Sequence, residues 1–220
     1  MFSDSAYDAA WRDLAPMFRV CLDQAWLSLG CRGLPVGAVV SFKGEDISRG
    51  RNRVYDPPGG DDPLQRTPVA HAEMNAIASA PPDFDLSDCR LWTTQEPCAM
   101  CSAAIDFAEI AGVAYLASDP SAGSGGRFVS SGGSDDIWIV VANALFLHNI
   151  AWLGGKDNPM LERNRLHEPE VVSLALNLVD HGSLMDPASR GASIEEALGE
   201  LWDQVEETSL RRRSRLRSGS

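Results

Sequence analysis

Apolar side chains recur at steps of three and four positions near the start of the chain, which predicts one amphipathic helix over residues 7–29. Gly30 follows directly and ends this pattern. The next apolar run, residues 36–42, is short and rich in valine, and it predicts a strand. A turn of Lys, Gly, Glu and Asp then predicts that residues 47–54 return beside it, so that the two segments form a hairpin.

The middle of the chain alternates between helical and strand patterns. Thr67 is a suitable N-cap followed by a proline, and it predicts a helix that continues to residue 80. Residues 89–94 and 112–117 predict strands, and residues 97–109 between them predict a second helix. This alternation is typical of an α/β sheet with parallel members, which binds ligands at the carboxyl ends of its strands.

The segments that link and follow these elements are longer. Residues 55–66 are rich in proline, glycine and aspartate and predict a loop, and residues 119–136 are rich in glycine and serine and predict a flexible segment. Residues 137–155 are almost long enough to span a bilayer. Three polar residues in the middle of that run favour instead a buried helix that continues into a buried strand, so we expect no membrane span.

Helical patterns return at residues 159–166, 169–178 and 193–207. The last of these helices is acidic, and the five arginines that follow it over residues 211–217 are expected to be disordered. We therefore divide the chain into a main domain of residues 1–180, an acidic helical extension of residues 181–210 and an arginine-rich tail of residues 211–220.

Length, charge and cysteine content narrow the class of protein. The chain has 220 residues, which suits one domain with a small appendage. Its formal net charge of −12 repels phosphate backbones and disfavours nucleic-acid binding, although the arginine tail keeps such a partner open. The cysteine count is odd and the N-terminal segment lacks the pattern of a signal peptide, so we expect a cytoplasmic protein with reduced thiols.

Two short motifs carry the candidate chemistry, HAE at residues 71–73 and PCAMC at residues 97–101. One imidazole and two thiolates are zinc ligands, and a site with three protein ligands keeps a fourth position for water. Cys98 and Cys101 lie three residues apart at the start of a predicted helix, so both thiols face one side. His71 lies in the first turn of the other predicted helix, so two helix N-termini are expected to converge on one zinc ion.

Glu73 lies two residues beyond His71 and so leaves the helix face of that ligand, which suits a carboxylate that reaches water rather than the metal. Zinc lowers the pKa of its bound water toward about 7. Glu73 is expected to take up that proton and pass it to a ring nitrogen and a leaving amine. The combination predicts hydrolysis of an amino group from a C=N carbon, and H-x-E followed by P-C-x-x-C is the signature of zinc deaminases.

Each motif by itself has a simpler explanation. HAE arises often by chance, and an isolated C-x-x-C also serves redox chemistry or half of a structural zinc site. A structural zinc needs four protein ligands, and the cysteines at positions 21, 31 and 89 show no paired spacing that would complete such a set. The two motifs together, in this order and on these elements, favour a catalytic zinc site.

In these motifs and their flanks the chain resembles the cytidine deaminase-like superfamily, and within it the branch of tRNA adenosine deaminases and bacterial guanine deaminases. The resemblance covers about residues 7–123. It is carried by residues 35–39, 50–53, 68–73, 93–105 and 113–123. These motifs are highly specific for the superfamily and much less so for the substrate.

The resemblance implies a three-layer α/β/α sandwich with a five-stranded mixed sheet, followed by C-terminal helices. Residues 148–153 are our choice for the fifth strand. The resemblance also implies that His71, Cys98 and Cys101 bind Zn²⁺ and that Glu73 shuttles protons. Homodimers are common in this branch, so a homodimer is expected here.

Four further residues are implied as substrate contacts: Asn52, Ala72, Pro97 and Asp119. For Asn52 a purely structural place beside a turn remains open, and so does the cap of a loop or helix for Asp119. The loop at residues 55–66 looks longer than in tRNA deaminases, and we expect it to narrow the pocket entrance.

Three hypotheses about function follow. The first is a zinc-dependent hydrolytic deaminase of a free purine or pyrimidine base, a nucleoside or a related small heterocycle. The second is a tRNA or polynucleotide deaminase, which the arginine tail supports and which would use the same kind of pocket for a flipped base. The third is a catalytically inactive scaffold or partner subunit, against which the presence of Glu73 argues.

Overall fold

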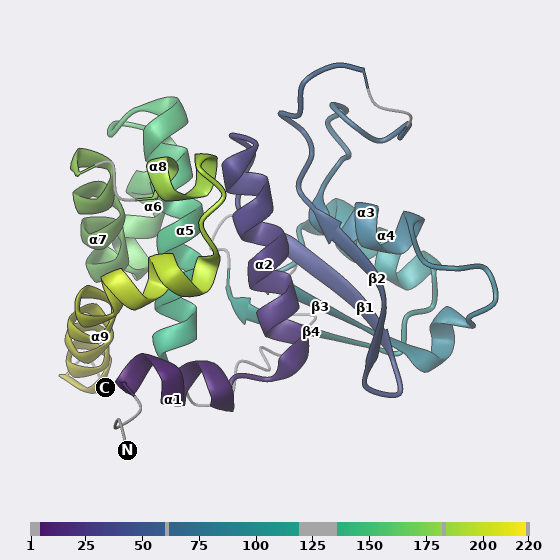
Figure 1. Cartoon of the computed structure of the whole chain (residues 1–220), viewed down its shortest axis with the longest axis horizontal. Helices are drawn as coiled ribbons and strands as arrows, with labels where there is room; N and C mark the ends of the chain where they lie inside the picture. The colour runs from purple at the N-terminus through teal and green to yellow at the C-terminus, as the bar shows by residue number, and fades with distance from the viewer. Residues whose placement is uncertain (1–4, 60–61, 119–135, 182–183, 219–220) are drawn as a thin grey trace.

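A sheet and a group of helices lie side by side, with one helix, α2, between them (Figure 1). The structure is a computed structural model that describes residues 5–59, 62–118, 136–181 and 184–218. In chain order its elements are α1 (Ala6–Asp13), α2 (Pro16–Gly30), β1 (Gly37–Phe42), β2 (Glu45–Arg51), α3 (Ala72–Ala78), the short 3₁₀ helix η1 (Leu86–Asp88), β3 (Cys89–Gln95), α4 (Ala99–Phe107), β4 (Gly112–Ala117), α5 (Asp136–Gly154), α6 (Pro159–His167), α7 (Pro169–Asp180), α8 (Met185–Ser189) and α9 (Ile194–Ser218).

The sheet is mixed, and its strand order is β2-β1-β3-β4. β1 pairs antiparallel with both β2 and β3, and β3 pairs parallel with β4. The prediction of five strands is wrong for the described residues, which form four, and residues 148–153 lie inside α5. Neither glycine nor proline interrupts α5 before Gly154, so a single long helix satisfies its backbone and no strand begins there.

The helix predicted over residues 7–29 is two helices, α1 and α2, because Pro16 interrupts it. Proline lacks an N–H group and pushes the preceding residue out of the helical region. Ala15 accordingly has φ −53° and ψ 134°, and Pro16 opens α2 at a position that suits it. The apolar period continues across the break, which is why the pattern alone predicts one helix.

Two glycines let helices approach β1 and β2 closely on opposite faces. A Cβ on Gly37 would lie 2.0 Å from the carbonyl oxygen of Cys21 in α2, and one on Gly50 would lie 2.2 Å from that of Ala72 at the start of α3. Gly50 is paired with Ala38, the neighbour of Gly37, so the two glycines face opposite sides of the sheet. α2 and α3 thus cover the two faces, in agreement with the predicted three layers.

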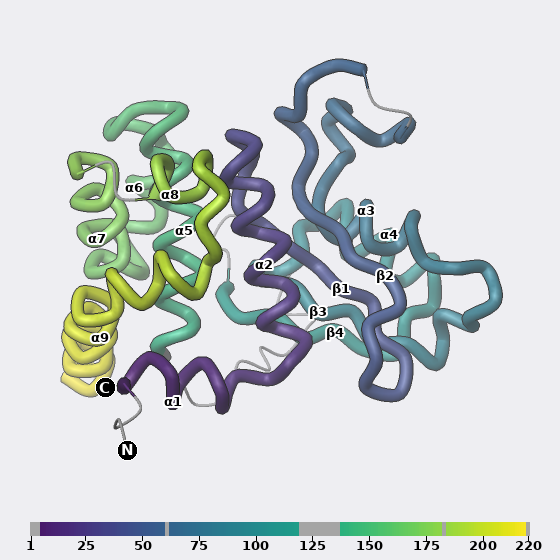
Figure 2. The backbone as a smooth tube through the Cα atoms, viewed as in Figure 1, coloured from purple at the N-terminus to yellow at the C-terminus, as the bar shows by residue number. Residues whose placement is uncertain are grey.

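The C-terminal helices share one large core with the N-terminal ones. The side chains of Leu22, Leu147 and Trp202, from α2, α5 and α9, belong to the same buried cluster. The rings of Tyr7 in α1 and Trp202 in α9 meet edge to face at 5.1 Å. The first and last helices of the chain, α1 and α9, therefore lie beside each other, as the tube in Figure 2 shows.

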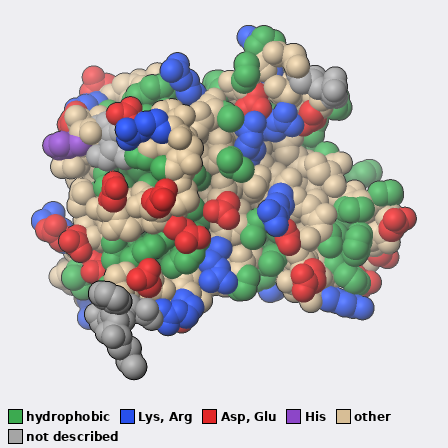
Figure 3. Space-filling view, viewed as in Figure 1, with side chains coloured by type: hydrophobic (Ala, Val, Ile, Leu, Met, Phe, Trp, Pro, Cys, Tyr) green, Lys and Arg blue, Asp and Glu red, His purple; other side chains and the backbone are tan. Residues whose placement is uncertain are grey.

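The arginine-rich segment, which we expected to be disordered, is helical as far as Ser218 and forms the end of α9. Arg212 bonds both carboxylate oxygens of Glu168 at 2.6 Å, and Arg215 bonds Glu170 at 2.7 Å. The partners lie more than forty positions earlier in the chain, so sequence spacing does not reveal them. On the face in Figure 3, acidic and basic side chains are interspersed rather than gathered in one basic patch.

Helix α5 is, among the described helices, the one that is long and apolar enough to cross a membrane by length and composition. Within its window of residues 137–154, 67% is buried inside the structure. The core helix of a protein that spans no membrane gives the same result. The structure thus confirms the buried helix that we predicted for this run and replaces the predicted strand after it.

Candidate active site

The predicted zinc ligands lie at two helix starts that meet beyond the ends of β2 and β3. Cys98 is the N-cap of α4, with φ −66° and ψ 171°. His71 is the N-cap of α3 rather than a residue of its first turn, and the predicted N-cap Thr67 is four residues too early. The hydroxyl of Thr67 donates to the carbonyl of Leu64 at 2.7 Å, so it does not cap a helix. Tight turns instead fill the chain between Thr67 and His71.

The three ligand atoms form an equilateral triangle. Nδ1 of His71 lies 3.6 Å from Sγ of Cys98 and 3.6 Å from Sγ of Cys101, and the two sulfurs are 3.6 Å apart. A tetrahedral zinc at its usual ligand distances would hold such atoms about 3.6–3.8 Å apart. The donor set and its spacing therefore fit zinc, with the fourth corner of the tetrahedron left for water or substrate.

The two thiols and the imidazole shift one another's pKa values. Hydrogen bonds from Cys101 and His71 lower the pKa of Cys98 to about 3. The hydrogen bond to Cys98, together with burial, raises the pKa of Cys101. The hydrogen bond with Cys98 also raises the pKa of His71. Zinc binds thiolates and neutral imidazole, so metal binding releases these protons.

Glu73 points into the same site from the first turn of α3. Its side chain is 3% exposed, and its Oε2 accepts a hydrogen bond from Cys101 Sγ at 3.5 Å. Burial raises the pKa of this carboxyl, although its hydrogen bonds and the charge of His71 oppose the shift. A carboxyl with a raised pKa beside a metal site is suited to both accept and donate a proton.

Two side chains that we did not predict position the site. The Asn75 amide nitrogen contacts three carbonyls, those of Arg51, Ala70 and His71, at 2.9–3.1 Å, which ties the start of α3 to the end of β2. The Ser28 hydroxyl lies 2.7 Å from the carbonyls of Leu34 and of Asn52. Neither role has a local signal, since each depends on carbonyls from another part of the chain.

A cavity of about 180 Å³ opens beside the zinc ligands. Three of the predicted site residues, His71, Glu73 and Cys98, line it. The other lining residues come from several elements: Leu34, Val36, Asn52, Gln95, Glu96, Phe146 and Met160. Phe146 and Met160 come from α5 and α6, and no motif in the sequence predicted them. The apolar pattern of α5 runs all round the helix, so it does not reveal which side chain faces a ligand.

The four predicted substrate contacts differ in their position relative to the cavity. Asn52 lines the cavity, whereas Ala72 and Pro97 are buried next to the ligands and do not line it. Asp119 lies outside the described residues. Substrate contact stays a prediction for all four.

None of the described residues of the loop at residues 55–66 lines the cavity, and its effect on the entrance stays a prediction. The loop projects from the end of β2 as the blue arm in Figure 1. A salt bridge network orders its base: Arg51 binds both oxygens of Asp56 at 2.7 Å, and Arg53 bonds Asp56, Asp62 and Gln65. The proline- and aspartate-rich composition predicts a loop, but it does not predict where the loop points.

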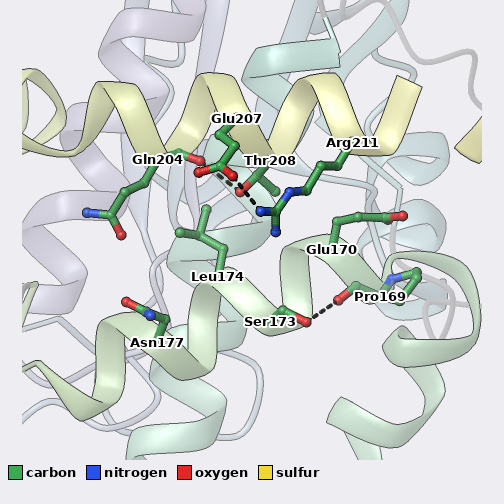
Figure 4. Close-up of a pocket in the computed structure, with 9 residues that line it drawn as sticks. All are labelled: Pro169, Glu170, Ser173, Leu174, Asn177, Gln204, Glu207, Thr208 and Arg211. Carbon is green, nitrogen blue, oxygen red and sulfur yellow. Dashed lines mark hydrogen bonds and ion pairs between the residues drawn. The ribbon is translucent and has the colours of Figure 1, made fainter. Parts of the chain in front are cut away.

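A second cavity, of about 350 Å³, lies between α7 and α9 (Figure 4). Its polar walls are occupied by contacts within the chain: Glu207 pairs with Arg211, Thr208 donates to the carbonyl of Gln204, and Ser173 donates to the carbonyl of Pro169. None of its lining residues is a histidine or cysteine. Although larger, this groove lacks the chemistry of the zinc site.

The fold and site together define a class, zinc-binding α/β proteins in which a carboxylate stands beside an open metal position. Residues 12–117 match the family model described as the cytidine and deoxycytidylate deaminase zinc-binding region. The chain belongs to this family of zinc-binding deaminases. The residues after 117 lie outside the match.

The relatives act on different substrates. The chain is 30% identical to a tRNA-specific adenosine deaminase of Aquifex aeolicus over 137 residues, which cover 61% of this chain and 80% of the relative. It is 35% identical to a guanine deaminase of Bacillus subtilis over 109 residues, which cover 46% of this chain and 65% of the relative. A solved structure from work on tRNA A34 deaminases shares 32% identity, covers 49% of this chain and 74% of its own, and has a TM-score of 0.42.

Proposed function

We propose that this protein is a zinc-dependent hydrolytic deaminase that releases ammonia from a free purine or pyrimidine base, a nucleoside or a related small heterocycle. The observation that carries the proposal is the position of Glu73. Its carboxylate is buried in the same cavity as the His71 and Cys98 ligand atoms and lies 3.5 Å from the third ligand, Cys101. A scaffold has no need of a buried proton carrier at that place.

The reaction replaces an amino group by oxygen. Water adds to the amino-bearing C=N carbon, the C–NH₂ bond breaks, and the products are a carbonyl compound and ammonia. Zinc in such a site supplies an activated water. Glu73 would take up one proton from the attacking water and deliver it to the ring nitrogen, and would then take up the second proton from the added hydroxyl group and deliver it to the leaving amine, so that one group acts as both base and acid.

Other cavity residues orient the substrate. The Asn52 side-chain oxygen accepts a hydrogen bond from the Val54 N–H at 3.1 Å, which leaves the amide nitrogen to donate to a ring acceptor. Leu34 and Val36 supply apolar surface on the side of β1. A planar heterocycle with an exocyclic amino group is the kind of molecule that suits this mixture of surfaces.

The first test is ammonia release, screened with the zinc-loaded protein across purines, pyrimidines, their nucleosides and tRNA. Replacing Glu73 by Ala should abolish activity, by about 10²–10⁴-fold or more, while zinc content is unchanged. Loss of zinc together with the carboxylate would contradict the role of Glu73. A zinc-loaded protein that releases no ammonia from any of these compounds would favour the scaffold hypothesis.

Deamination of tRNA is the second candidate. The tRNA-specific adenosine deaminases among the relatives favour it. The net charge of −12 and the pairing of Arg212 and Arg215 with glutamates count against it, because paired arginines neutralise no phosphates. Activity on tRNA without activity on small compounds would replace the first candidate by the second.

Two further properties are proposed. A cytoplasmic location is supported by the five cysteines, all of which are free thiols. A homodimer is supported by the family resemblance. Cell fractionation tests the first, and light scattering on the purified protein tests the second; a monomer at micromolar concentration would contradict it.

A further inference from the structure

We propose that Phe146 and Met160 form a specificity wall, an apolar surface that restricts the substrate to a bare, uncharged base and excludes nucleotides and polynucleotides. This inference rests on the proposed function and names its substrate class. Both residues line the cavity of the zinc ligands, and both lie outside the residues 12–117 that match the family. The wall therefore comes from the part of the chain outside the match to the family model.

Phe146 is held in place by both halves of the molecule. Its half-buried ring packs against the cluster of Val36, Ala72 and Ile105 and also against the large cluster of the C-terminal helices. One turn earlier in α5, the carbonyl of Ala142 accepts a hydrogen bond from the Gln95 amide at 3.1 Å. This bond ties α5 to the end of β3, three residues before the ligand Cys98, so the ring faces the metal site in a fixed position.

Met160 is presented by the start of α6. Asn158 caps this helix by accepting a hydrogen bond from the Met160 N–H at 2.9 Å. The amide of Asn164 donates to the Met160 carbonyl at 2.9 Å, and the wholly buried Leu161 anchors the same turn. The backbone on both sides of Met160 is thus fixed, while its thioether side chain can adapt to the edge of a flat ligand.

The size of the cavity favours a base. Its volume of about 180 Å³ is below the range of about 300–1,000 Å³ that drug-sized ligands occupy. A base that fills this volume leaves little room in the cavity for an attached ribose. An aromatic ring and a thioether offer a sugar no hydrogen-bond partner, whereas they make good contacts with the face and edge of a heterocycle.

The charge of the cavity excludes a phosphate. The acidic residues Glu73 and Glu96 both line it, and among the described residues no lysine or arginine does so. Phosphates are bound by such cations or by the N–H groups of free helix starts. Here the N-cap residues of α3 and α4 are His71 and Cys98, the predicted metal ligands. The phosphate of a nucleotide, free or within an RNA, would therefore be repelled by these two carboxylates and would not be bound by a cationic side chain of the described lining.

Binding measured by calorimetry tests the wall without turnover. The starting protein is the zinc-loaded Glu73→Gln variant, which keeps the metal ligands, and the probes are adenine, guanine, cytosine, their nucleosides and their 5′-monophosphates. We expect one base to bind about tenfold or more tightly than its nucleoside, and its monophosphate to bind more weakly still. Adding Met160→Ala should reduce the base-to-nucleoside ratio by about tenfold.

Matched controls come from exposed positions of comparable helices. Leu166 lies in α6 and is 81% exposed, so Leu166→Ala should leave the ratio unchanged. Phe146→Leu keeps an apolar side chain but loses the flat ring, and should weaken base binding by about two- to tenfold. Phe107, which is 92% exposed at the end of α4, provides its control as Phe107→Leu.

The outcomes separate the two proposals. A nucleoside or monophosphate that binds as tightly as the base, a ratio that Met160→Ala does not change, or no binding of any probe would overturn the wall. Ammonia release by the unmutated protein is recorded in parallel. If the binding ratios respond as expected but no ammonia is released, the wall stands and the proposed deamination fails.

Discussion

At the scale of single residues, the site depends on side chains that the backbone of the α3 helix start brings close together. Glu73 reaches Cys101 because His71 caps α3 and the carboxylate follows in the first turn. Asn75 holds that helix start by three carbonyls, one of them from β2. Motif letters predict the ligands and the proton carrier, whereas the supporting amide and hydroxyl act through backbone groups that carry no sequence signal.

One buried residue predicts the pH dependence of stability. His148 in α5 is wholly buried, and neither of its ring nitrogens has a hydrogen-bond partner among the described residues. Burial lowers its pKa from 6.5 to about 4. The unfolded chain therefore binds this proton more readily than the folded one between these values, so its stabilising contribution is complete above pH 6.5 and is lost as the pH falls toward 4, by about 3 kcal/mol at most.

The measurement is urea unfolding at pH 7 and pH 5 for the unmutated protein and for His148→Leu. The variant should lose less stability between the two pH values. His167→Leu replaces an exposed histidine and serves as the control, with the pH dependence of the unmutated protein. Equal pH dependence in all three proteins would show that His148 is accommodated in its charged form.

At the scale of elements, the end of α9 is ordered by its contacts and not by its composition. Arg212 is 8% exposed and pairs with both oxygens of Glu168. Its neighbour Arg211 makes an exposed pair with Glu207, with 68% and 62% of the two side chains accessible. The arginine-rich end of α9 is therefore helical because its arginines pair with acidic residues of α7 and of the α7 N-cap.

Replacing either of these neighbouring arginines is expected to change the free energy of unfolding by very different amounts. Arg212→Met removes the close, largely buried pair with Glu168, which keeps a contact with Arg215 at 3.8 Å, and should lower the free energy of unfolding by about 1–3 kcal/mol. Arg211→Met, in the same helix, should change it by about 0–1 kcal/mol, since exposed ion pairs contribute little. Urea unfolding at pH 7 checks both values. Equal effects of the two variants would mean that the Arg212 pair is as solvated as the Arg211 pair.

At the scale of the whole molecule, α2 joins the catalytic sheet to the C-terminal helices, as Figure 1 shows. It packs closely on β1 at Gly37 on one side and contributes Leu22 and Leu29 to the large cluster on the other. Residues 181–210, which we separated as an extension, contribute Leu184 and Trp202 to that same cluster. The division into domains stays a prediction: the family-matched half has a smaller buried cluster of its own, which includes Val36, Ala76 and Ile105, while its helix α2 shares the large cluster with the C-terminal helices.

Zinc is expected to stabilise the folded chain as well as supply chemistry. The metal joins α3 to α4, and a ligand bound only by the native state at 100 times its Kd adds about 2.7 kcal/mol. Chelation should therefore lower the Tm by about 5–10 °C in differential scanning calorimetry. Cys101→Ser should lower the Tm and abolish the response to chelator, whereas the exposed Cys31→Ser should retain it. A Tm that does not depend on zinc would indicate a site formed equally well without metal.

By itself the sequence predicted the strands β1 to β4 within a few residues and the group of His71, Cys98 and Cys101, which the structure brings together as a possible metal site. It also predicted Glu73 as the proton carrier, a role that stays a proposal. These follow from short-range spacing, because strand alternation, helix starts and ligand pairs are encoded within a few neighbouring positions. Only the tertiary structure decided that Phe146 and Met160 face the metal site and that the arginine-rich end is helical. Both depend on packing between segments distant in the chain, where an apolar or charged residue has many possible partners and its own neighbours do not select one.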